Sequence, residues 1–255
     1  MLVPSLHATH GNSMLRAFAA LGPLLLVLPL LLLHSGGPAG AGTAPLSRQG
    51  VHVIGDSIAR GVHKTALDAD HRPPRWTVDA RGGRRMTALG TWYIPRTNNY
   101  WRYVRHIFSI NRHRPMRTAV IGLGTNGADE DMAVAEARTY YRNAIRRVRY
   151  HGEWRTGPKR VVLVTPWRDP SHAEGTSNPR TGQPYASYQY ADKLAVYYRA
   201  ILHVAREEPY VCVANWRAYA RSRPWLFSDG VHPRQHGREA WARIVIRAVD
   251  RCGKW

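Results

Sequence analysis

The chain has 255 residues, and the part that follows an N-terminal segment typical of export has the size of one α/β domain. Lys and Arg number 37 against 17 Asp and Glu, so the formal net charge is +20, which favours polyanionic partners. The arginines are scattered rather than gathered into a DNA-reading motif, and neither an HExxH motif nor a cluster of Cys and His occurs. Nucleic-acid binding is therefore the weaker interpretation, and we expect no metal or other cofactor.

The first residues of the chain have the features of an export signal. An uncharged apolar stretch from Ala17 to Leu33 follows Arg16 and precedes a run of small residues, which is the order found in signal peptides. An uncleaved anchor is the alternative, because seventeen residues is about the shortest stretch that spans a bilayer. We expect residues 1–41 to be a signal peptide or membrane anchor, 42–50 a linker, and 51–255 the folded domain, secreted or tethered outside the cytoplasm.

Apolar, β-prone runs alternate with helical stretches beyond the linker. Apolar residues recur at helical spacing from about Asp131 to Tyr150 and from Tyr188 to Glu207, and a last helix is expected to begin at Pro233. Strands separated by helices form parallel sheets, so the sequence predicts an α/β domain with a five-stranded parallel sheet. The five predicted strands are Val51–Ile54, Trp76–Ala80, Thr118–Gly122, Arg160–Thr165 and Val211–Asn215.

A long segment from Pro166 to Ser187 lacks any helical or strand pattern and is rich in Pro, Gly, Ser and Thr. Loops of that length in a compact domain are often functional, so we interpret it as a candidate substrate-facing lid. Trp167 and Arg168 at its start, with Asn98–Trp101, are candidate substrate contacts, because aromatic faces commonly stack on sugars. Core packing is an equally open interpretation for each of them.

Two cysteines, Cys212 and Cys252, are the whole complement of the chain. In an exported protein an even pair indicates a disulfide, which here would join a predicted core strand to the end of the last helix. Two buried free thiols are the alternative.

A candidate nucleophile follows the first predicted strand, in Gly55-Asp56-Ser57. Sites in open α/β sheets form beyond the carboxyl ends of the strands, and a serine at the start of the next helix gains free N–H groups and partial positive charge. A serine that only caps the helix is the alternative interpretation.

A candidate base lies near the end of the chain, in Asp229-Gly230-Val231-His232. An imidazole can take a serine proton only when its other nitrogen is held as a donor, and Asp229 is placed to do that for His232. Because the chain has 13 histidines, the neighbourhood of His232 rather than its residue type singles it out.

Two glycine-flanked turns follow other predicted strands. One contains Asn126, whose side-chain amide could donate to an oxyanion, and the other contains Gly83, where the backbone could approach a substrate closely. Taken singly, both are ordinary turn residues.

These four blocks, taken in their order along the chain as Ser57, Gly83, Asn126 and His232, resemble those of the SGNH hydrolase superfamily. The resemblance implies a flavodoxin-like three-layer α/β/α fold, with Ser57 as nucleophile, His232 as general base and acid, and Asp229 orienting His232. It also implies an oxyanion hole formed by the N–H groups of Ser57 and Gly83 and the amide of Asn126. Three motifs are similar to those of the extracellular SGNH domains of peptidoglycan O-acetyltransferases: Asp79-Ala80-x-x-Gly83-Arg84, Gly124-Thr125-Asn126-Gly127 and Asp229-Gly230-Val231-His232. The multi-span acyl-donating domain of those proteins is absent from this sequence.

The resemblance implies a serine-dependent acyl ester hydrolase acting outside the cytoplasm, on an acylated carbohydrate or lipid. An O-acyltransferase to cell-wall or other polysaccharide hydroxyls would use the same residues. A third hypothesis is a non-catalytic basic module that binds an anionic cell-wall polymer or membrane surface, motivated by the charge of +19 that remains beyond residue 41. A general arginine bias would explain that charge equally well. We expect a monomer.

Overall fold

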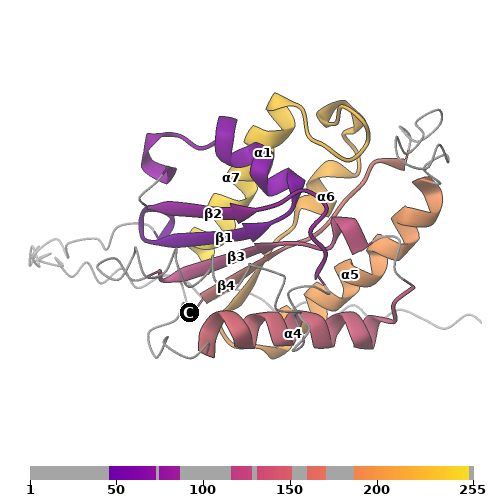
Figure 1. Cartoon of the computed structure of the whole chain (residues 1–255), viewed down its shortest axis with the longest axis horizontal. Helices are drawn as coiled ribbons and strands as arrows, with labels where there is room; N and C mark the ends of the chain where they lie inside the picture. Colours follow the sequence, from indigo (N-terminus) through magenta and orange to yellow (C-terminus); the bar gives the residue numbers. More distant parts are fainter. Residues whose placement is uncertain are drawn as a thin grey trace, which may run out of the picture. The chain divides into compact units, whose positions relative to one another are not determined.

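Five parallel strands form one sheet in the order β2-β1-β3-β4-β5 (Figure 1). The strands are β1 (Val51–Gly55), β2 (Trp76–Ala80), β3 (Thr118–Gly122), β4 (Arg160–Val164) and β5 (Val211–Ala214). The computed structural model describes residues 46–72, 75–86, 116–127, 131–150, 160–170 and 187–252. The predicted five-stranded parallel sheet is confirmed.

Helices cover both faces of the sheet, because the central strands are apolar on both sides. All five residues of β1 are buried. Helices α1 (Ser57–Thr65) and α7 (Gln235–Arg251) lie on one face, and α4 (Val134–Tyr150) and α5 (Ser187–Glu207) lie on the other (Figure 1). Alternate strand residues therefore join two separate apolar cores, with Val53 and Val120 under α1 and α7, and Ile54 and Ile121 against α4 and α5. This is the predicted three-layer α/β/α arrangement.

The last helix does not begin where the sequence predicted. Pro233 forms an antiparallel bridge with Phe227, and α7 starts at Gln235 after Arg234 as its N-cap. The expectation that Pro233 is the first helical residue is therefore wrong, because pairing with residue 227 holds it in an extended turn.

One short helix was not predicted at all. Helix α6 (Trp216–Ala220) follows β5 directly, and the Asn215 side chain caps it by accepting from the N–H of Ala218 at 3.1 Å. The fifth strand therefore ends at Ala214, one residue earlier than expected, because Asn215 serves the helix instead of the sheet.

A disulfide between Cys212 and Cys252 joins β5 to the residue that caps the end of α7. The two Cα atoms lie 5.7 Å apart, within the ordinary range for such a bond. The predicted pairing is present in the structure.

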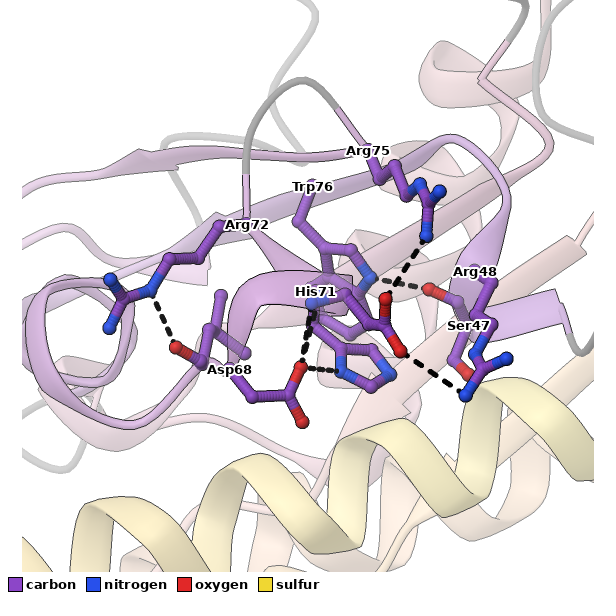
Figure 2. A network of polar contacts seen from close by, with 9 residues as sticks. Ser47, Arg48, Asp68, His71, Arg72, Arg75 and Trp76 are labelled. Carbon is purple, nitrogen blue, oxygen red and sulfur yellow. Dashed lines mark hydrogen bonds and ion pairs between the residues drawn. The ribbon is translucent and has the colours of Figure 1, made fainter.

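The start of the described chain is attached to the domain by polar contacts (Figure 2). Ser47 donates its N–H to Asp250 on α7, and its carbonyl accepts from the indole of Trp76 on β2, both at 2.7 Å. Nearby, His71 contacts Asp68 at 2.6 Å, and its ring meets Trp76 edge-on. The chain therefore enters the domain at a fixed point, beside β2.

Several sequence-based expectations fall outside the described residues. These are the signal peptide or anchor at residues 1–41, the candidate contacts Asn98–Trp101, and positions 171–186 of the candidate lid. Among the helices that the structure describes, none combines the length and apolar character needed to cross a bilayer.

Candidate active site

Ser57, Asp229 and His232 meet at the carboxyl end of the sheet. Ser57 is the first residue of α1, immediately after β1, whereas Asp229 and His232 lie on the turn of residues 228–233 that leads into α7. The Nε2 atom of His232 lies 3.0 Å from Ser57 Oγ, and its Nδ1 lies 2.7 Å from Asp229 Oδ2. The three side chains therefore form one hydrogen-bonded line, although 175 positions separate the serine from the histidine.

The 228–233 turn holds its own geometry through the second oxygen of Asp229. Asp229 Oδ1 accepts from the N–H groups of Val231 at 3.0 Å and His232 at 2.7 Å. Both the N–H and the hydroxyl of Ser228 donate to the carbonyl of His232, and Gly230 takes a positive φ of 76°. Partial burial raises the pKa of Asp229, but these N–H groups and the imidazole outweigh it and hold the pKa below its ordinary value. Asp229 is thus a carboxylate at neutral pH, suited to orient an imidazole.

Asp56 fixes the start of the helix that carries Ser57. Its Oδ1 atom accepts from the N–H of Ile58 at 2.9 Å, and the residue is only 1% exposed. Burial raises the pKa of Asp56 to about 6, against the opposing effects of the Ile58 N–H and the charges of His232 and Arg168. Sequence reasoning assigned this residue no role, since nothing in a Gly-Asp-Ser tripeptide reveals how deeply its carboxyl is buried.

The two predicted oxyanion turns are joined to each other. Asn126 lies on the short helix η3 (Thr125–Gly127) after β3, and its Nδ2 atom donates to the carbonyl of Arg84 at 3.3 Å. Gly83, the residue before Arg84, has a φ of 71°, which favours glycine. Because β1, β2 and β3 are neighbours in the sheet, Ser57, Gly83 and Asn126 follow adjacent strand ends.

Arg84 holds the Gly83 turn against the sheet, a role that its place in the Asp79-to-Arg84 motif did not reveal. Its guanidinium donates to the carbonyl of Asp79 at 2.7 Å and forms an ion pair with the Asp79 carboxylate at 2.9 Å. It also reaches the carbonyl of Gly55, just before the Asp56–Ser57 pair, at 3.3 Å. An acid and an arginine five positions apart, on either side of two glycines, were the available signal.

Two tyrosines from the helices beneath support the Asn126 turn. Tyr141 donates its hydroxyl to the carbonyl of Leu123 at 2.9 Å. A Cβ at Gly124 would lie 2.8 Å from that hydroxyl, and a Cβ at Gly127 would lie 2.1 Å from the hydroxyl oxygen of Tyr197. The glycines on both sides of Asn126 are therefore required by close packing, which fixes where its amide lies.

The predicted substrate contacts Trp167 and Arg168 follow β4. Trp167 is 7% exposed, and the guanidinium of Arg217 covers its ring at 5.0 Å, so little of its surface is left for a substrate. Arg168 is half-buried and close enough to Asp56 for its charge to lower the pKa of that residue. The next residue, Asp169, donates its N–H to the carbonyl of Gly230 at 2.7 Å, which ties this segment to the 228–233 turn. A substrate role for Trp167 or Arg168 stays a prediction.

Across the described ranges, no group of three or more His, Cys, Asp or Glu side chains is arranged to hold a metal ion. The chemistry that this arrangement can perform is acyl transfer, since it joins a hydroxyl, a base and candidate oxyanion donors.

The sequence profile of the GDSL-like lipase/acylhydrolase family matches residues 53–240. The chain belongs to this family. The matched part of this GDSL-like chain contains Ser57, Gly83, Asn126, Asp229 and His232, and therefore the whole candidate site. A search of curated proteins finds no match.

Two solved structures with TM-scores of 0.50 share the fold of this GDSL-like chain at low sequence identity. A protein assigned as an SGNH hydrolase from Slackia heliotrinireducens is 18% identical with a TM-score of 0.50, covering 78% of this chain and 98% of that one. A protein assigned as an arylesterase from Agrobacterium tumefaciens is 19% identical with a TM-score of 0.50, covering 79% and 98%. The C-terminal catalytic domain of peptidoglycan O-acetyltransferase A from Streptococcus pneumoniae is 20% identical with a TM-score of 0.49, covering 80% and 94%.

Proposed function

We propose that this GDSL-like chain is a serine-dependent acyl ester hydrolase that acts outside the cytoplasm through an acyl-enzyme. The observation that carries the proposal is the hydrogen-bonded line from Asp229 through His232 to Ser57, with distances of 2.7 and 3.0 Å. The contact of 3.0 Å between Ser57 and His232 has a length that permits proton transfer from nucleophile to base. The contact of 2.7 Å between Asp229 and His232 can hold the imidazole in the required tautomer.

The proposed reaction has two halves. Ser57 Oγ attacks the ester carbonyl while His232 Nε2 takes its proton, and the N–H groups of Ser57 and Gly83 with the Asn126 amide stabilise the oxyanion. His232 then gives the proton to the leaving alcohol, and the acyl group stays on Ser57 as an ester. Water enters, loses a proton to His232 and attacks that ester, which releases the carboxylic acid and restores the Ser57 hydroxyl.

The exposure of the site supports an ester carried on a large substrate. The side chains of His232 and Asp229 are 49% and 46% exposed, so the reacting groups lie at the surface. Such a site can reach an acyl group on a polysaccharide or at a lipid surface. The net charge of +20 would hold the enzyme near an anionic polymer or membrane.

Covalent labelling with a serine-directed fluorophosphonate, together with hydrolysis of an activated acetyl ester, tests the proposal. The wild type should be labelled and active, and Ser57→Ala should lose both properties. Ser222→Ala is the matched control, because Ser222 is exposed on the turn after α6 and should keep full labelling. A wild type that is neither labelled nor active would support the basic binding module instead.

An O-acyltransferase is the second candidate, favoured by the same surface exposure of the reacting groups, which would admit a sugar hydroxyl in place of water. Incubation with the acetyl ester and an oligosaccharide separates the two reactions. Acetylated sugar at the expense of free acetate indicates transfer, whereas acetate alone at saturating oligosaccharide indicates hydrolysis.

A further inference from the structure

Within the part of the chain that the structure describes, Asp56 uses only one of its two carboxyl oxygens in hydrogen bonds. Oδ1 accepts from the N–H of Ile58, but Oδ2 is buried and has no hydrogen-bond partner among the described residues. A buried acceptor without a partner is costly, and native proteins usually satisfy such atoms with another group or with water. This oxygen therefore needs a partner that the described chain does not supply.

A small cavity beside the candidate active site offers that partner a place. Asp56 and Trp216 both line it, and the indole Nε1 of Trp216 is a buried donor that likewise has no partner within the described ranges. Thr165, a further lining residue, already accepts from the N–H of Arg217 at 2.8 Å and contacts Asn215 at 3.2 Å. Because both residues line this cavity, a single buried water in it would supply partners for the free acceptor of Asp56 and the free donor of Trp216.

The charged and titratable groups around Asp56 come from three other elements. His232 approaches from the 228–233 turn and Arg168 from the end of β4, and the charge of each favours the ionised carboxyl. Tyr141 on α4 is buried, which raises its pKa, so it remains a neutral phenol. The ionised carboxyl therefore stabilises positive charge on His232, which develops when the imidazole takes the proton of Ser57.

We propose that Asp56 is a positioning residue of the hydrolytic reaction, whose carboxylate, held by Ile58 and by a water bound to Trp216, fixes Ser57 and favours proton transfer to His232. The proposal rests on the proposed function, because it needs Ser57 and His232 to react. It gives the buried carboxylate a role that helix capping alone does not require, since a neutral side chain caps a helix equally well.

Asp56→Asn separates charge from capping. Its side-chain oxygen can still accept from the N–H of Ile58, but it carries no charge at any pH. We expect kcat/KM for an activated acetyl ester to fall roughly tenfold at pH 8, the effect of one unit charge in a partly solvated site. Because the wild-type carboxyl has a pKa of about 6, the deficit should shrink to about twofold at pH 5. Asp68→Asn, which alters the exposed capping residue of the short helix η2 (Ala69–His71), should match the wild type throughout.

Trp216→Phe provides a second variant that keeps the charge and removes the indole donor. Without that donor the bound water holds the ionised carboxyl less well, so the acid limb of the kcat/KM profile should move to higher pH. Fluorophosphonate labelling of every variant, with thermal melts to verify folding, keeps the two proposals distinct. A labelled, folded Asp56→Asn protein with unchanged kcat/KM, or with a deficit that does not vary with pH, overturns the role of Asp56 alone. An unlabelled and inactive wild type overturns both proposals.

Discussion

The contact between Asp229 and His232 can be tested by Asp229→Asn. The amide oxygen can still accept the N–H groups of Val231 and His232, which lie 3.0 and 2.7 Å from Asp229 Oδ1, so the turn should keep its shape. The amide nitrogen then faces His232 Nδ1 and donates to it, which places the ring proton on Nε2 and leaves no lone pair for the proton of Ser57. Where this tautomer error occurs in a buried triad, kcat falls by about ten-thousandfold.

The half-exposed site should moderate that loss. The Asp229 side chain is 46% exposed, so water can compete for His232 Nδ1 and allow the productive tautomer part of the time. We expect kcat/KM for an activated acetyl ester to fall roughly a thousandfold at pH 8, which corresponds to about 4 kcal/mol of transition-state stabilisation. Steady-state kinetics on the folded variant measures the loss.

A second Asp-His pair supplies the control for this prediction. Asp68 Oδ1 accepts from the N–H groups of Asp70 and His71 at 3.0 and 3.2 Å and also lies 2.6 Å from His71 Nδ1. Asp229 makes the corresponding contacts with both of its oxygens. The ring of His71 packs edge-on against Trp76 rather than against a serine hydroxyl. Asp68→Asn should therefore leave kcat/KM unchanged. An Asp229→Asn protein within tenfold of the wild type, or an equal loss in both variants, would refute the orienting role.

Three further predictions concern stability and the oxyanion turn. Replacing Cys212 and Cys252 by Ala should lower the free energy of unfolding by about 4 kcal/mol, because the disulfide closes a loop of 40 positions. A wild-type melting temperature that does not change when reductant is added would contradict this prediction. Burial raises the pKa of Asp56 to about 6, so folding favours the protonated carboxyl. The stability that this carboxyl contributes is fully present below about pH 4 and is lost as the pH rises through 6. The free energy of unfolding of Asp56→Asn, measured in denaturant titrations, should therefore rise by about 3 kcal/mol relative to that of the wild type between pH 4 and pH 8. If the two free energies depend on pH in the same way, the carboxyl of Asp56 does not ionise in a buried site. Asn126→Ala should lower kcat roughly a hundredfold or more with little change in KM, and a loss under fivefold would exclude its amide from the oxyanion hole.

The sequence predicted the five-stranded sheet and the pairing of Asp229 with His232 because their signals are local. Each strand is an apolar run that ends at glycine or polar turn residues. Asp229 and His232 share one short turn, whose hydrogen bonds form within five residues. No local signal links Asp229 and His232 to Ser57. Their proximity was predicted from the order of the four blocks along the chain, which resembles that of a known superfamily.

The contacts that supporting residues make with distant parts of the chain could not be predicted from local signals. Arg84 acts through carbonyls at residues 55 and 79, and Tyr197 limits Gly127 from a helix that begins 60 positions further along. The start of α7 was misplaced for a similar reason. A proline is favoured in a first helical turn, but its pairing with Phe227 prevailed over that preference.

The disulfide also has a consequence for the fate of a damaged enzyme. Asp229 and His232 both lie between Cys212 and Cys252, so the proposed base and its proposed orienting acid lie on a covalently closed ring. A single protease cut between Cys212 and Cys252 divides the chain into two pieces, and the disulfide keeps these pieces covalently joined. Release of the segment that bears His232 then requires a second cut or, when the first cut lies before His232, reduction of the disulfide.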